Sequence, residues 1–83
     1  MKVKKNVALS DSGFLFNPSS GESYSVNPIG QEIIKMLNEE SSEEEIIATL
    51  LEKYNVERDT LEKDIRDFFG MLELYGVVKP EEA

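Results

Sequence analysis

The sequence contains no cysteine and no histidine. Without cysteine there is no disulfide, thiol nucleophile or Cys/His zinc site, and without histidine no Ser-His-Asp triad can form. The serines therefore lack the base that would activate a nucleophile, and the glycines lack the spacing of phosphate-binding or dinucleotide-binding loops. A metal site made of carboxylates alone stays formally open. We nevertheless expect a protein that is not an enzyme and has no catalytic residue, cofactor or metal site.

Positive charge is also scarce. The chain has 9 lysines and arginines against 17 acidic residues, a net charge of −8. Three of the nine are Lys2, Lys4 and Lys5, so the rest of the chain carries −11 (6 basic minus 17 acidic). Nucleic-acid binding depends on neutralising phosphates with lysine and arginine. This balance argues against DNA or RNA as a partner, and favours a basic partner or simply solubility.

Long apolar runs are absent as well, since none approaches the roughly 20 residues of a membrane helix. The segment Met1–Ser12 is positively charged but has no apolar stretch after it, unlike a signal peptide. Hydrophobic residues make up 40% of the 83 residues, which suits a globular domain and not a disordered acidic tail. We expect one domain over residues 1–83, located in the cytoplasm, with no membrane contact.

The first third of the chain has strand patterns. Val3–Leu9 alternates with period two, Phe14–Phe16 is apolar, and Glu22–Val26 alternates serine with tyrosine or valine. The segments S-D-S-G and N-P-S-S-G between them are turns by composition. Three strands joined by short turns predict an antiparallel meander in which Glu22–Val26 lies at an edge.

The remainder has helical periodicity. Asn27 and Pro28 suit the N-cap and first position of a helix over Pro28–Asn38. A second helix should begin after Ser41 or Ser42, with a capping box to Glu44 or Glu45, and end near Tyr54. A third is expected over Arg58–Tyr75, with Gly76 ending it. Its core stripe comprises Leu61, Ile65, Phe68 or Phe69, Leu72 and Tyr75. Val77 and Val78 should form a docked tail, and Lys79–Ala83 should be frayed.

The predicted fold class is therefore α+β and winged-helix-like, a three-stranded antiparallel meander followed by three helices. Winged-helix domains usually read DNA with a helix. Here the third helix region carries three basic and six acidic residues, a ratio that would repel phosphates. These are Arg58, Lys63 and Arg66 against Glu57, Asp59, Glu62, Asp64, Asp67 and Glu73.

The segments FNPSSGESYSVNPIGQEIIKML, EEEIIATLLEKYNV and DIRDFFGMLELYGVV, read in order, resemble the PqqD-like family, named for pyrroloquinoline quinone (PQQ) biosynthesis protein D. The similarity extends from about Val7 to Val78. Asn17 departs mildly from the family pattern, in which aspartate is common. The matching positions are Asn17, Ser20-Gly21, Tyr24, Asn27 and Gly30.

The resemblance implies a non-catalytic recognition element for ribosomally made, modified peptides. Family members bind the leader segment of a precursor peptide and deliver it to a modifying enzyme, often of the radical-SAM class. The leader is held as an added strand against the third strand, in a cleft bounded by the third helix. PQQ is one product among several, and nothing in this sequence selects it.

The residues themselves are compatible with this function. An edge strand exposes unpaired N–H and C=O groups, which β-augmentation uses for affinity. The small side chains of Ser23 and Ser25 would let a guest strand approach, while Tyr24 and Val26 would either pack inward or line a pocket. On the third helix the expected contacts lie on or beside the core stripe. They are Asp64, Asp67, Phe68 and Met71.

Other functions stay open at this point. Met71 and Leu74 form an apolar patch beside acidic residues, which suits a peptide with apolar anchors and basic residues. The same patch would serve equally as a homodimer contact or as ordinary surface. The alternatives are a small acidic adaptor or oligomerising protein that uses the same groove, and a winged-helix transcriptional regulator acting through Lys2, Lys4 and Lys5.

Overall fold

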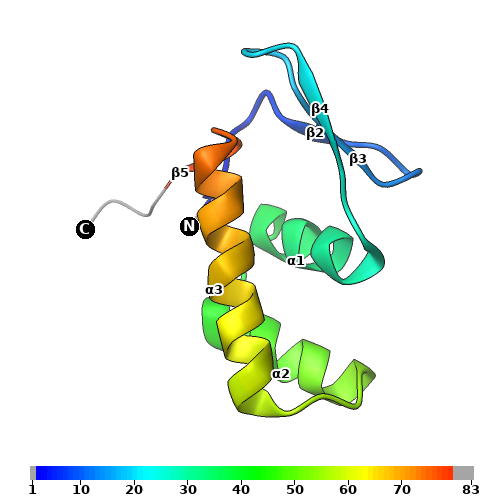
Figure 1. Ribbon diagram of the computed structural model, residues 1–83, viewed down its shortest axis with the longest axis vertical. Coiled ribbons are helices and arrows are strands. Elements are labelled where there is room, and N and C mark those ends of the chain that lie inside the picture. The colour runs from blue at the N-terminus through cyan, green and yellow to red at the C-terminus, as the bar shows by residue number, and fades with distance from the viewer. Residues whose placement is uncertain (1, 80–83) are drawn as a thin grey trace.

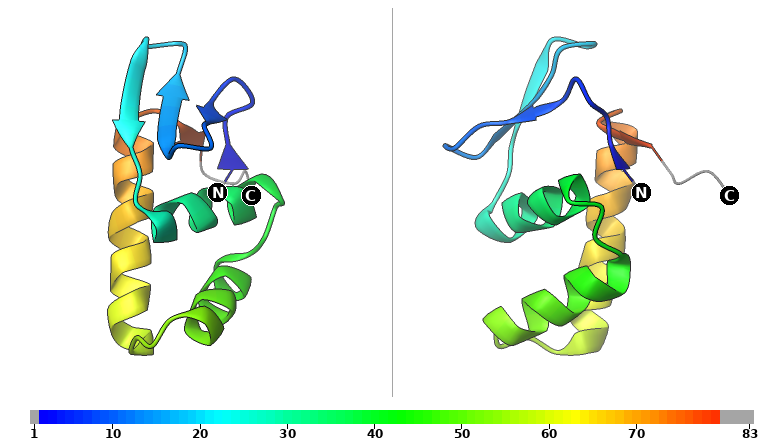
Figure 2. Two further views of the ribbon diagram at one scale, coloured as in Figure 1. Left: turned by 90° about the vertical axis from the view of Figure 1, so that its right-hand side faces the viewer. Right: turned by 180° about the vertical axis from the view of Figure 1, so that it is seen from behind.

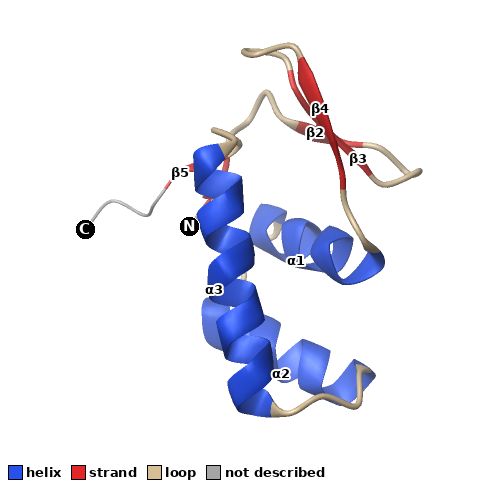
Figure 3. Ribbon diagram, viewed as in Figure 1, coloured by secondary structure: helices blue, strands red, loops and turns tan. Residues whose placement is uncertain are grey.

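The computed structural model describes residues 2–79 and has the α+β architecture expected from the sequence (Figure 1, Figure 3). A meander of three antiparallel strands precedes three helices, and a pair of short strands joins the two ends of the chain. The three helices match their predicted bounds to within about one residue. The elements are β1 Lys2–Val3, β2 Ala8–Leu9, β3 Phe14–Asn17, β4 Glu22–Ser25, α1 Pro28–Asn38, α2 Glu43–Lys53, α3 Arg58–Leu74 and β5 Val78–Lys79.

The predicted first strand, Val3–Leu9, is wrong as a single element. The chain turns within it, where the Val7 amide donates to the Lys4 carbonyl at 3.1 Å. The part before the turn, β1, pairs with β5 in the register Val3↔Val78, whereas the part after it, β2, pairs with β3. Alternation along the sequence contains no information about a partner more than 70 residues away, which is why one strand was expected.

The end of the described chain follows α3 directly. Gly76 has φ of +73°, the left-handed conformation at which helices commonly end. Glycine adopts it without steric strain because it has no Cβ atom. Val77 and Val78 are buried, so the docked tail is confirmed. Lys79, expected to be frayed, is paired with Lys2 in β5, which corrects that prediction. The other residues of the expected frayed end, 80–83, lie outside the described part of the chain.

Helix starts follow the predicted caps. The Asn27 side chain accepts a hydrogen bond from the Gly30 amide at 2.7 Å, and Pro28 occupies the first turn. Ser42 and Glu45 form a reciprocal capping box, with bonds of 3.1 and 2.9 Å. Each device satisfies backbone amides that have no partner within the helix.

The core lies between the helices. Each helix contributes three of the twelve buried apolar side chains, and Val77 and Val78 add two more. Within the described residues the meander contributes only Leu15. Along α3 the expected stripe is confirmed, with Leu61, Ile65 and Leu72 buried, and with Phe68, Phe69 and Tyr75 half-buried against the core. The meander sits above α1 at the C-terminal end of α3, and α2 lies at the other end (Figure 1, Figure 2).

Candidate functional site

β4 forms one edge of the meander, as predicted, because the strand order is β2-β3-β4. Its register with β3 pairs Tyr24 with Leu15 and Ser25 with Phe14. The Phe14 carbonyl accepts from the Ser10 amide at 2.8 Å, so Phe14 is bonded on its β2 side. Bonded and non-bonded pairs alternate in an antiparallel ladder. The backbone groups of Tyr24 therefore face β3, while the N–H and C=O groups of Ser23 and Ser25 face the open edge.

The two faces of β4 differ in chemistry. Ser23 and Ser25 are exposed on the outer face, opposite Phe16 and Phe14 respectively. Both phenylalanines are large exposed hydrophobic residues, at 42% and 50% exposure. The expectation of small side chains along the edge is met, but the outer sheet face beside them is more apolar than the serines alone indicate.

Tyr24 packs inward on the other face. Its ring stacks on Tyr75 at the end of α3, with centroids 4.0 Å apart and planes 6° from parallel. Its hydroxyl donates to the Glu22 carboxylate at 3.2 Å. Burial, followed by that hydrogen bond and the negative charge of Glu22, raises the pKa of Tyr24. This stack agrees with the packing role considered for Tyr24, because it joins the edge strand to the end of α3; a contact of Tyr24 with peptide stays a prediction.

Val26 is likewise half-buried against the core, at the junction of β4 and α1. A Cβ atom on Gly30 would lie 2.6 Å from the Val26 Cγ1 atom and 3.1 Å from the Phe68 ring. The absence of a side chain at Gly30 thus permits β4, α1 and α3 to approach one another here. The resemblance included a small residue at this position, and close packing is its physical reason.

Asn17 is a structural residue whose role the sequence did not reveal. It is 4% exposed, and its side-chain amide donates to the carbonyls of Tyr75 and Gly76 at 3.3 and 3.5 Å. Its side-chain oxygen accepts from the Ser19 amide. The turn before β4 is thereby attached to the C-terminal end of α3. An aspartate here would have no N–H to donate to those carbonyls.

A groove of about 320 Å³ lies between α1 and α3, next to the end of β4. All four predicted α3 residues line it: Asp64, Asp67, Phe68 and Met71. The predicted β4 residues do not, so the predicted site separates into an open strand edge and an adjoining groove. Leu74, expected beside Met71, is 83% exposed and also lies outside the groove lining. The sequence missed the opposite wall, which is Asn27, Ile29, Gly30 and Ile33, and the contributions of Val56 and Thr60.

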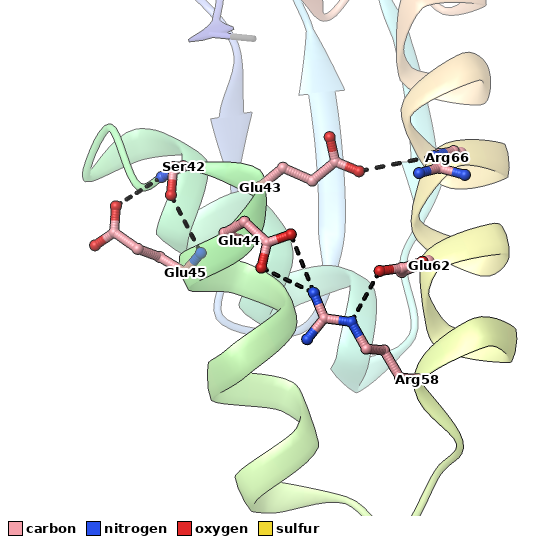
Figure 4. A network of polar contacts seen from close by, with 7 residues as sticks. All are labelled: Ser42, Glu43, Glu44, Glu45, Arg58, Glu62 and Arg66. Atoms are coloured by element: carbon pink, nitrogen blue, oxygen red, sulfur yellow. Dashed lines mark hydrogen bonds and ion pairs between the residues drawn. The ribbon is translucent and has the colours of Figure 1, made fainter.

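The two arginines of α3, Arg58 and Arg66, contact acidic residues of α2 (Figure 4). Neither arginine lines the groove. Arg58 makes two hydrogen bonds to Glu44 on α2, at 2.8 and 3.0 Å, and one to Glu62 at 2.9 Å. These contacts, that with Glu44 foremost, raise the pKa of Arg58. Arg66 lies 3.9 Å from Glu43. Within residues 2–79, neither Asp64 nor Asp67 forms an ion pair.

The described residues include no group of three or more acidic side chains arranged to hold a metal ion. Within the same part of the chain, the helices are too short or too polar to cross a membrane.

Two solved structures resemble the whole chain. The structure of TbiB1 in complex with the TbiA(beta) leader peptide is 27% identical, with a TM-score of 0.87, and the match covers 100% of both chains. Lasso peptide synthetase B1 complexed with the leader peptide is 28% identical, with a TM-score of 0.83, covering 95% of this chain and 96% of that one. No curated protein matches the sequence.

The family model for coenzyme PQQ synthesis protein D (PqqD) matches residues 13–78, which include β3, β4, all three helices and Val78. Both the open edge and the groove lie inside this range. The chain belongs to the PqqD family.

Proposed function

We propose that this protein captures the leader segment of a ribosomally made precursor peptide as an added strand on β4 and presents it to a modifying enzyme. The observation that carries the proposal is the open edge at Ser23 and Ser25, whose backbone groups face away from β3. The two similar structures support it, because each is described as a complex with a leader peptide.

The edge alone supplies limited affinity. Two residues with outward backbone groups offer two donors and two acceptors. Each hydrogen bond to the peptide replaces hydrogen bonds to water, so its net contribution is only about 0.5–1.5 kcal/mol. Strand addition of this kind relies on side-chain pockets for the rest of the affinity and for specificity. The groove at the end of β4, with Phe68 and Met71 in its lining, is placed to supply that second contact.

The protein would act through binding alone, and the modifying enzyme would supply the chemistry. The family resemblance favours a radical-SAM enzyme as the partner. The similarity to lasso peptide synthetase B1 makes an enzyme of lasso peptide synthesis a second candidate partner. Which precursor and which product are involved depends on that partner.

The outer sheet face favours a second candidate, an adaptor that contacts another protein or a second copy of itself. Phe14 and Phe16 are about half exposed on this face and are flanked by small serines. Sedimentation over a range of concentrations tests self-association. A wild-type dimer that becomes monomeric in the double variant Phe14→Ser with Phe16→Ser would favour this candidate. A wild type that is monomeric at every concentration would rule out self-association.

The proposed function is tested by recording amide NMR shifts while a synthetic leader of a ribosomally made precursor peptide is added. We expect shifts concentrated on Glu22–Val26 and α3, and loss of binding in Ser25→Pro, because proline removes an outward donor yet is tolerated at a sheet edge. Ser25→Ala is the matched control, since it keeps the N–H and should still bind. Equal binding by the proline and alanine variants would contradict strand addition.

A further inference from the structure

The groove between α1 and α3 is long enough to contact several peptide residues. Its lining runs along α3 from Thr60 to Met71, a distance of about 16 Å at 1.5 Å per residue. An extended strand advances about 3.3 Å per residue, so about five residues of peptide would lie along this face. The lining includes Asn27, two residues after β4 ends at Ser25, so the groove adjoins the end of the strand.

Its floor is apolar. Ile33, Leu61 and Ile65 form the buried part of the lining. Met71 and Val56 line it too, and they are 46% and 40% exposed. An apolar side chain seated here would remove these surfaces from water, which is the main favourable term in such contacts. A volume of about 320 Å³ lies at the small end of the roughly 300–1,000 Å³ range of ligand sites, so one or two side chains would fill it.

The charged part of the lining is entirely negative. Asp64 and Asp67 are exposed, and among the described residues no lysine or arginine lines the groove. The nearby arginines that could have neutralised them, Arg58 and Arg66, contact the acidic first turn of α2 instead. The charged group of a lysine or arginine in the guest peptide could therefore contact these two carboxylates, while its methylene groups pack on the adjacent apolar surface.

We infer that the groove selects leaders in which an apolar side chain is flanked by lysine or arginine, with Asp64 and Asp67 as the residues that read the charge. The inference rests on the proposed function and names the class of leader that this chain accepts. Each exposed charge contact is expected to change affinity by up to about fivefold, enough to choose between leaders that share the same apolar residue.

The test is selection of random 12-residue displayed peptides on the immobilised protein. The wild type is compared with a double variant, Asp64→Lys with Asp67→Lys. The matched control, Glu52→Lys with Glu73→Lys, makes the same change in net charge elsewhere. Glu73 lies about 180° around α3 from Asp64, and Glu52 is exposed on α2. Ser25→Pro is carried through the same selection, and circular dichroism checks that every variant is folded.

We expect peptides selected on the wild type and on the control to pair an apolar residue with lysine or arginine within about five positions. On the Asp64/Asp67 variant the preference should switch to glutamate or aspartate. Binders without a charge preference, or an equal switch in the control, would overturn the inference and leave the proposed function standing. Undiminished selection on Ser25→Pro, or no selected peptide on the wild type, would instead contradict the proposed function.

Discussion

The helices and the meander of this protein are stabilised by different kinds of contact. The helices share a core to which each contributes three buried apolar side chains. The meander is attached through Leu15 and through two individual contacts with the end of α3, namely the hydrogen bonds of the Asn17 amide and the Tyr24–Tyr75 stack. Tight packing makes the helical layer sensitive to any change in volume, whereas the open side of the meander has little packing to lose.

The helical layer and the N-terminal part that contains the meander also differ in charge. Residues 28–79 contain 13 acidic and 6 basic residues, a net −7, whereas residues 2–27 contain 2 acidic and 3 basic residues, a net +1. Three of the acids, Glu43 and Glu44 of α2 and Glu62 of α3, pair with arginines that do not line the groove. Stability therefore resides mainly in the helical layer, while the exposed side chains of the strand edge can vary with little effect on the fold.

The largest effect should come from the helical core. Ile46→Ala should lower the free energy of unfolding by about 2–5 kcal/mol, because Ile46 is fully buried and its truncation leaves a cavity. Phe14→Ala on the outer sheet face should cost about 1 kcal/mol or less. Urea titration followed by circular dichroism gives both values. Similar losses for the two variants would contradict the division between core and meander.

Asn17→Asp tests how the meander is attached. It should lower stability by about 1–3 kcal/mol, since the carbonyls of Tyr75 and Gly76 lose their donor and a negative charge is placed at the C-terminal end of α3. The control is Asn55→Asp, at an exposed position between α2 and α3. The same urea titration is used, and equal losses of stability in the two variants would contradict the attachment of the meander through Asn17.

Ser42→Ala probes a helix start in the acidic layer. Loss of the side-chain bond to the Glu45 amide should cost about 1 kcal/mol. The control is Ser41→Ala, one residue earlier and outside the capping box. Differential scanning calorimetry of the two variants should show a lower melting temperature only for Ser42→Ala. No difference would mean that packing, and not the cap, determines where α2 begins.

The smallest effect concerns pH. A hydrogen bond from Lys53, then one from Tyr54, lowers the pKa of Glu32, so this carboxylate stabilises the folded state above its unfolded pKa. That contribution is lost as pH falls through the lowered folded pKa. Glu32→Gln should therefore be less stable than the wild type at about pH 7, and the difference in stability should shrink as the pH falls below about 4.3, the usual pKa of glutamate. A stability difference between Glu32→Gln and the wild type that persisted unchanged in acid would show that the ion pair is not its source.

Local signals were sufficient for much of the fold. Asn27, Pro28, Ser42 and Gly76 mark helix ends by their own chemistry, so α1, α2 and α3 could be placed from the sequence alone. Partners distant in sequence could not be found in this way. The pairing of β1 with β5 and the attachment of Asn17 to Tyr75 join segments more than 50 residues apart.

In the candidate site, too, contacts between segments distant in sequence could not be predicted from local patterns. Helical spacing was enough to bring Asp64, Asp67 and Met71 onto one face, and the groove confirms that grouping. The facing wall from α1 depends on how two helices cross, which no local pattern specifies. The outward direction of the Ser23 and Ser25 backbone groups depends on strand register, since a shift of one residue would turn them toward β3.

The most direct test is hydrogen exchange of the β4 amides, measured by NMR with and without the tightest-binding selected peptide. In the free protein the Ser23 and Ser25 amides should exchange quickly and the Tyr24 amide slowly, because only Tyr24 is bonded to β3. Bound peptide should slow Ser23 and Ser25 strongly and change Tyr24 little. Saturating peptide that leaves both serine amides in fast exchange would contradict strand addition at β4.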